Sequence, residues 1–246
     1  MKRFLPLLLF LSGTLLLIGT LYFFVLRKPA TKVEEEEEAL TTVALADRPV
    51  ASLTPSEDGH WLTLKIEKLK IDAQSLDYEL LYTLPDGRTQ GVPGTITLKG
   101  ESSLERKLLL GSESSGKFRY DEGVETGTLT LRFRNAKGKL VAKFATKFHL
   151  QSGEKELTAA DNKFSFKFDK LPAKTFFVTM ETFGLPQSPP GSISAGPYGV
   201  FSSGKTSSSG KVEVLGGSPY GLSDSEWTKL DNGESADIGI FIAVSE

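Results

Sequence analysis

Apolar and polar residues alternate along most of the chain from Trp61 onward. A period of two is typical of strands with one buried face, so this region is expected to be rich in antiparallel β-structure. The clearest pair of runs, 128–134 and 139–150, is joined by Asn-Ala-Lys-Gly at 135–138 and predicts a β-hairpin. Further strands are predicted over 62–66, 76–84, 95–98, 106–110, 117–120, 164–168, 175–183, 198–201, 211–215 and 237–244. Strands at this density are typical of a sandwich.

The N-terminal segment has a different pattern. Residues Phe4–Leu26 contain no charged side chain, and as a helix they would extend about 35 Å, enough to cross a membrane. This run is longer than the apolar core of a cleaved signal peptide, so we expect it to remain as a signal anchor. Basic residues flank it on both sides and do not fix its orientation. A short N-terminal tail followed by a large body nevertheless favours export of the body.

These patterns divide the chain into four parts. Residues 1–28 are expected to form a cytoplasmic tip and transmembrane anchor, and 29–59 an acidic, flexible linker that contains the run Glu34–Glu38. A first β-sandwich domain is predicted over 60–152, and a second β-rich domain with long Pro-, Gly- and Ser-rich loops over 153–246. One larger β unit is the alternative. The expected fold class is mainly β, with an N-terminal transmembrane helix followed by antiparallel, immunoglobulin-like sandwiches.

Composition removes several classes of chemistry. The chain has no cysteine and two histidines, His60 and His149, so disulfides, iron–sulfur clusters, cysteine-ligated zinc and multi-histidine metal sites are not expected. The net charge of −2 gives no overall attraction to nucleic acid. No cofactor is predicted, while a calcium site built from carboxylates stays open.

Two local sequences resemble catalytic or ligand-binding motifs, and each has an ordinary explanation. Gly111–Lys117 has the G-x-x-x-x-G-K spacing of a phosphate loop, but Phe118 stands where a Ser or Thr must ligate magnesium. A turn between strands is predicted there instead. Asp121 and Glu122 are the nearest pair of carboxylates for glycoside hydrolysis, and they too are expected in a solvated turn. The sequence therefore predicts no enzymatic activity and no catalytic residue.

Two sets of residues are candidates for ligand binding. The first is a basic face of the predicted hairpin that would bind an anionic ligand, and it consists of Arg132, Arg134, Lys143, Lys147 and His149. The second is a group of aromatic residues in or beside the long C-terminal loops that would stack on sugars or anchor a protein, namely Tyr198, Phe201, Tyr220 and Trp227. An ordinary solvated strand face is the alternative for the first set, and core packing for the second.

One short helix is also expected near the C-terminus. Ser223 and Glu226 have the spacing of a capping box, in which each side chain bonds a free backbone amide of the first helical turn. The helix would begin directly after Ser223 and would include Trp227.

Placement and architecture together favour a non-enzymatic protein on the outside of the cell membrane. The expected function is binding, or a structural role, in the cell envelope. Its membrane contact would be Phe4–Leu26, and its partner an envelope protein or polysaccharide. Two alternatives stay open: a surface hydrolase that acts on polysaccharide, and an assembly factor or adhesin for another envelope protein.

Overall fold

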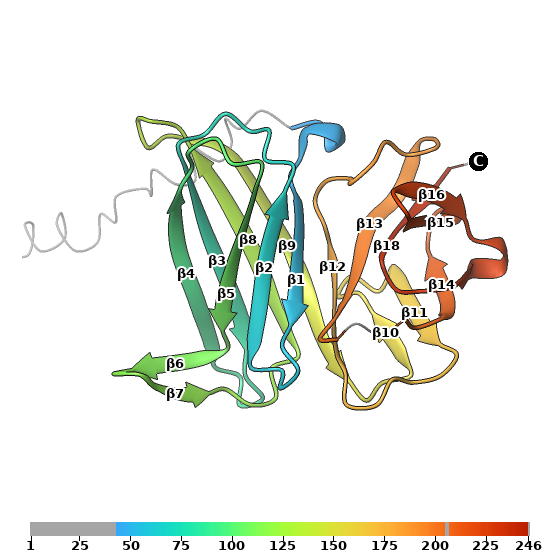
Figure 1. The fold of residues 1–246 in the computed structure, drawn as a ribbon, viewed down its shortest axis with the longest axis horizontal. Coiled ribbons are helices and arrows are strands. Elements are labelled where there is room, and N and C mark those ends of the chain that lie inside the picture. Colours follow the sequence, from blue (N-terminus) through green and yellow to red (C-terminus); the bar gives the residue numbers. More distant parts are fainter. Residues whose placement is uncertain (1–42, 205–206, 246) are drawn as a thin grey trace, which may run out of the picture. The chain divides into compact units, whose positions relative to one another are not determined.

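The computed structural model describes residues 43–204 and 207–245, which form antiparallel sheets (Figure 1). The helical elements of these residues are two short 3₁₀ turns, η2 (Leu45–Asp47) and η3 (Asp231–Gly233). The prediction of a mainly β, sandwich-like body is confirmed. No helix within the described ranges is long and apolar enough to cross a membrane. The predicted span Phe4–Leu26 lies outside them.

Two sheets face each other in a first sandwich. Its strands are β1 (Val50–Pro55), β2 (Trp61–Glu67), β3 (Ser75–Thr83), β4 (Thr89–Thr97), β5 (Ser103–Leu109), β8 (Thr126–Arg134) and β9 (Leu140–Ser152). One sheet has the order β1-β2-β5, and the other is the part β9-β8-β3-β4 of a nine-stranded sheet. Leu64, Leu131 and Phe133 lie in the core between them and are 0% exposed.

The nine-stranded sheet continues into a second sandwich. After β9 come β12 (Phe176–Glu181), β13 (Ile193–Ser202), β18 (Ile240–Val244), β15 (Ser218–Ser223) and β16 (Glu226–Lys229). A four-stranded sheet packs on them and consists of β10 (Glu156–Thr158), β11 (Phe164–Phe168), β14 (Gly210–Val214) and β17 (Glu234–Ser235). Phe166, Phe177 and Phe241 fill the core between these sheets.

A separate hairpin connects two strands of the first sandwich. It consists of β6 (Gly111–Ser114) and β7 (Lys117–Tyr120), which pair with each other in a two-stranded sheet. In Figure 1 it extends away from the other sheets at the lower left. Within Gly111–Lys117 the predicted turn between strands is formed by Ser115 and Gly116, while Gly111–Ser114 belong to β6 and Lys117 begins β7.

β12 is buried on both faces because it belongs to both sandwiches. Val178 and Met180 point into the first core, and Phe177 points into the second. Successive side chains of a strand point to opposite faces, so the two cores lie on opposite faces of the nine-stranded sheet. The predicted domain boundary between 152 and 153 falls between β9 and β10. Strands from both sides of that boundary pair directly in this sheet, β9 with β12.

The predicted hairpin of β8 and β9 is confirmed, and its turn sequence explains the geometry. The side-chain oxygen of Asn135 accepts hydrogen bonds from the backbone amides of Lys137 and Lys139, at 3.0 and 3.1 Å. An Asn side chain thus satisfies two backbone donors that the reversal of the chain leaves unpaired.

The linker predicted over 29–59 is too long. Val50–Pro55 form β1, which pairs with β2, and Ala51 and Leu53 are fully buried in the first core. This strand is short and ends in a proline, a combination that resembles linker composition in the sequence. Its burial depends on β2 and β12, which lie later in the chain.

The helix predicted at Ser223 is wrong. Ser223 and Glu226 pair across the turn of the β15–β16 hairpin. Between them, Asp224 and Ser225 have φ of 48° and 68°, so the chain reverses in the left-handed region instead of continuing into a helix. A Ser with an acidic residue three positions later suits a tight turn as well as a helix start.

The shared strand β12 predicts that the two sandwiches unfold together. Phe177→Ala removes a buried ring from the second core and is expected to lower the free energy of unfolding by about 3–5 kcal/mol. Because β12 also fills the first core, near- and far-ultraviolet circular dichroism should report one denaturant transition. Leu215→Ala, at a position 64% exposed, is the control and should change little. If two denaturant transitions are seen and Phe177→Ala shifts the midpoint of only one, the sandwiches are two independent domains.

Candidate functional site

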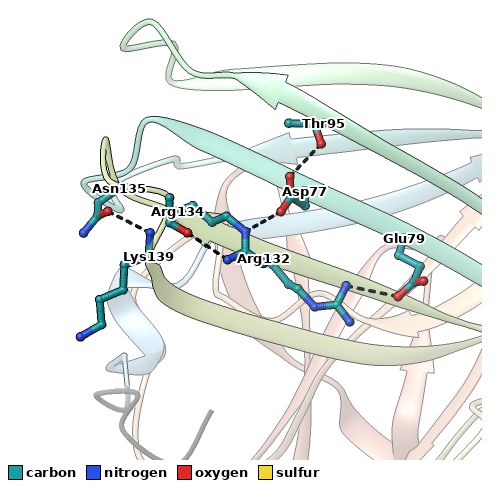
Figure 2. Close-up of polar contacts among 8 residues, drawn as sticks. Asp77, Glu79, Thr95, Arg132, Arg134, Asn135 and Lys139 are labelled. Atoms are coloured by element: carbon teal, nitrogen blue, oxygen red, sulfur yellow. Dashed lines mark hydrogen bonds and ion pairs between the residues drawn. The ribbon is translucent and has the colours of Figure 1, made fainter. Parts of the chain in front are cut away.

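The basic face predicted on β8 and β9 is partly neutralised by acidic residues of β3. Arg134 Nε lies 2.7 Å from Asp77 Oδ2, and Arg132 Nη1 lies 3.2 Å from Glu79 Oε2 (Figure 2). The register places Asp77 opposite Arg132, so each ion pair runs diagonally across the two strands. Such pairs are the cross-strand contacts that stabilise a sheet face.

Asp77 shows how closely these groups interact. Partial burial of its carboxylate would raise the pKa of Asp77, but hydrogen bonds from Arg134 and from the Thr95 hydroxyl outweigh this effect. The pKa is therefore held below its usual value. Lys143 lies opposite Arg132 on β9 and is half-buried. Arg132 and Arg134 are thus committed to acidic neighbours within the sheet.

His149 belongs to a polar cluster between the nine-stranded sheet and β10 of the four-stranded sheet. Its Nδ1 lies 3.1 Å from the backbone oxygen of Thr158 on β10. The same oxygen accepts hydrogen bonds from the buried Thr179 hydroxyl at 2.6 Å and the buried Gln151 carboxamide at 3.2 Å. This cluster joins β9, β10 and β12. Lys147, on β9, remains exposed to solvent.

The four aromatic residues predicted near the C-terminal loops are distributed over three hydrophobic clusters. Tyr198 is 1% exposed in the second core, and its hydroxyl donates to Asp161 Oδ2 at 2.7 Å. Phe201, on β13, packs against the first core, and Tyr220 and Trp227 pack against a third, smaller cluster. They do not present one common aromatic surface.

The β6–β7 hairpin instead carries exposed aromatic side chains. Phe118 and Tyr120 are 45% and 38% exposed, and they contact His60 and Trp61 at the start of β2. These four residues are named the hairpin site. The sequence reasoning missed it, although Phe118 and Tyr120 alternate along a predicted strand and so share one face.

The rings of the hairpin site form an ordered row. The His60 and Tyr120 rings stack with centroids 4.3 Å apart and an interplanar angle of 12°. The Phe118 ring lies 6.2 Å from that of Tyr120 at an angle of 8°, and Trp61 meets Phe118 edge-on at 5.6 Å. Three nearly parallel rings thus stand side by side at the surface.

The strand register gives the hairpin two different faces. Phe118 pairs with Glu113, and Tyr120 with Gly111, on the aromatic face. The residues between them, Lys117 and Arg119, point to the opposite face. A carboxylate therefore accompanies the rings, and the cations of β7 lie behind them. Glu122 adds a second carboxylate, with Oε1 3.9 Å from His60 Nε2.

The base of the hairpin is fixed to the first core. The Tyr82 hydroxyl, which belongs to a buried residue of β3, donates to Asp121 Oδ2 at 2.8 Å. Burial and this bond raise the pKa of Tyr82, so the hydroxyl stays protonated. Gly111 has φ of 148°, and a Cβ there would lie 2.2 Å from the Arg119 carbonyl oxygen. Only glycine allows so close an approach of the two strands.

A second candidate lies where the two sandwiches meet. A cavity of about 180 Å³, named the junction cavity, is lined by Lys147, Asp161, Glu181 and Tyr198, among others. Desolvation of the carboxylate and the negative charge of Asp161 raise the pKa of Glu181. Glu181 is still exposed to solvent on one side, which limits the size of the effect. Asp161 is already engaged by the Tyr198 hydroxyl.

Tyr82→Phe tests whether the hairpin is held from its base. The variant keeps the buried ring and loses the hydroxyl that bonds Asp121, so we expect a loss of about 1 kcal/mol of stability. Amide hydrogen exchange of residues 111–120 should accelerate more than that of β8 or β9. Tyr78→Phe, also on β3, is the matched control. Equal exchange rates in the hairpin of Tyr82→Phe and of the native protein would contradict this anchoring.

Glu181→Gln tests the cavity by its pH dependence. A carboxyl whose folded pKa is raised contributes stability below its unfolded pKa, near 4.5, and loses it as the pH rises through the folded value. The variant should therefore be more stable than the native protein at pH 7, and the difference should vanish below pH 4.5. Thermal denaturation of both proteins, from below pH 4.5 to pH 7, measures this difference in stability. The exposed Glu154→Gln should show no such trend, and a pH-independent difference at 181 would refute the assignment.

Comparison with known proteins does not add a family to these features. A scan against protein-family models and a search of the curated proteins gave no match to this chain. What the hairpin site binds has therefore to be inferred from its side chains and their geometry.

Proposed function

We propose that this chain is a single-pass membrane protein whose β body lies outside the cytoplasm and binds a component of the cell envelope through the hairpin site. The uncharged segment Phe4–Leu26 is the anchor, and the acidic run Glu34–Glu38 lies in the stalk that separates it from the body. The role is binding, without catalysis.

The observation that carries this proposal is the exposure of aromatic rings on a fixed hairpin. Contact with water makes exposed rings unfavourable, and clusters of them are typical of interaction surfaces. Tyr and Trp are also the residues that most often dominate the energy of protein interfaces. The anchored base of the hairpin keeps Phe118 and Tyr120 in place before a ligand arrives, which reduces the entropy lost on binding.

We further infer that the first sandwich is immunoglobulin-like. Its support is the division into a sheet of three strands, β1-β2-β5, and a facing part of four strands, β9-β8-β3-β4. Three and four antiparallel strands are the numbers of an immunoglobulin constant-type domain. Such domains present their loops and hairpins at the ends of the sheets, which is consistent with a binding site on β6–β7.

A polysaccharide-acting hydrolase is the second candidate, and the carboxylates at the junction cavity favour it. Hydrolysis of a glycosidic bond uses two carboxyl groups, one with a raised pKa as the general acid. Glu181 has a raised pKa and Asp161 lies near it. The hydrogen bond from Tyr198 gives Asp161 a structural task, so this candidate ranks below the binding function.

The proposal is tested with the full-length protein in intact membranes of its source. Protease added from outside should cleave the body, and intact mass should show that residues 1–28 are retained. The purified protein in nanodiscs should then bind the envelope fraction of the same cells, and the double variant Phe118→Ala/Tyr120→Ala should weaken this binding about tenfold or more. Both positions are exposed, so the variant is expected to fold.

The control for the binding measurement is Leu215→Ala. Leu215 is an exposed apolar residue at 64% exposure, remote in sequence from the hairpin, and its removal should leave binding unchanged. A body protected from external protease would refute the topology. Equal binding by the native protein and the double variant would refute the hairpin site as the binding surface.

A further inference from the structure

We propose that the ligand of the hairpin site is an uncharged polysaccharide, an inference that rests on the proposed envelope-binding function and specifies its ligand. Phe118 and Tyr120 are 45% and 38% exposed, with ring centroids 6.2 Å apart and ring planes within 8° of parallel, and His60 stacks on one face of Tyr120. This spacing is on the scale of one sugar unit, so neighbouring sugars of one chain would contact neighbouring rings. Pyranose sugars have an apolar C–H face that packs against aromatic rings.

The charges beside the rings select against anionic ligands. Glu113 lies directly opposite Phe118 on the aromatic face, and Glu122, whose side chain is 82% exposed, lies beside His60. Carboxylates accept hydrogen bonds from sugar hydroxyl groups, but they repel phosphate, sulfate and uronate. Lys117 and Arg119 point to the other face of the hairpin, where they do not offset this repulsion.

The same charges disfavour the other occupants of an exposed aromatic surface. An anionic membrane surface would meet Glu113 and Glu122 together with the rings. In a second copy of this chain packed face to face on the same site, each carboxylate would approach its own counterpart. An uncharged chain rich in hydroxyl groups satisfies both the rings and the carboxylates.

The first experiment separates the ligand class from the proposed function. The full-length protein in nanodiscs is incubated with the envelope fraction after periodate oxidation, which cleaves the vicinal diols of sugars, or after protease digestion. Periodate should abolish binding, and protease should leave it unchanged. Binding that survives periodate and is lost after protease overturns the polysaccharide ligand and leaves the envelope-binding function standing. If the native protein does not bind even the untreated envelope fraction, both the polysaccharide ligand and the envelope-binding function are overturned.

The second experiment uses defined probes. Isothermal titration calorimetry compares the uncharged hexamer of β-1,4-linked glucose, whose units each carry the vicinal diol that periodate cleaves, with the polyanion alginate. The uncharged hexamer should bind the native protein. Its affinity for Phe118→Ala and for Tyr120→Ala should be about tenfold weaker, and its affinity for Leu215→Ala should be unchanged. Affinity should vary little between 50 and 500 mM salt, because no ion pairs form. Salt-sensitive binding of alginate alone, or binding of empty vesicles, overturns the inference.

Discussion

The burial of β12 on both faces is the constraint on which the rest of this structure depends. Its side chains must suit two cores at once, with Val178 and Met180 in the first and Phe177 in the second. Thr179 is fully buried and polar, so its hydroxyl needs a partner, and the Thr158 backbone oxygen supplies one at 2.6 Å. This bond links β10, and with it the four-stranded sheet, to the shared strand β12. The four-stranded sheet of the second sandwich is thus held to the nine-stranded sheet by a polar contact as well as by apolar packing.

Two buried tyrosines fix the features that project from this framework. Tyr82 donates to Asp121 at the base of the hairpin, and Tyr198 donates to Asp161 in the turn between β10 and β11. Burial, together with the neighbouring carboxylate, raises the pKa of both hydroxyls, so each remains a donor at any ordinary pH. A rigid core residue thereby orders an exposed turn. In the first case the ordered turn carries the hairpin site, and in the second it forms one wall of the junction cavity.

The sequence predicts the strands well where one face of a strand is buried, and less well elsewhere. The runs at 128–134 and 164–168 alternate clearly, and the structure places β8 and β11 there. β12 reads Phe-Phe-Val-Thr-Met, a run without alternation, because both of its faces are buried. Such a run does not say which sheets cover it. Periodicity alone therefore does not predict that one sheet joins the two sandwiches.

The candidate surfaces were harder to predict because they depend on strand order. The sequence shows Arg132 and Arg134 in a row without acidic neighbours, yet Asp77 and Glu79 reach them from β3, more than 50 residues earlier. The hairpin site likewise combines residues 60–61 with residues 118–120, which only the packing of β7 beside the start of β2 brings together. Periodicity gives the face of each side chain but not its neighbour on the next strand.

The dependence on strand order also explains why the proposed function rests on the aromatic residues and not on the basic ones. The two arginines form ion pairs within the sheet, so their presence has a structural explanation. The exposed rings of Phe118 and Tyr120 lie outside both hydrophobic cores. A two-stranded hairpin is marginally stable by itself, and apolar rings in water do not improve the solubility of a protein. A hairpin that is anchored at its base and carries exposed rings outside both cores supports the proposal that a ligand covers these rings.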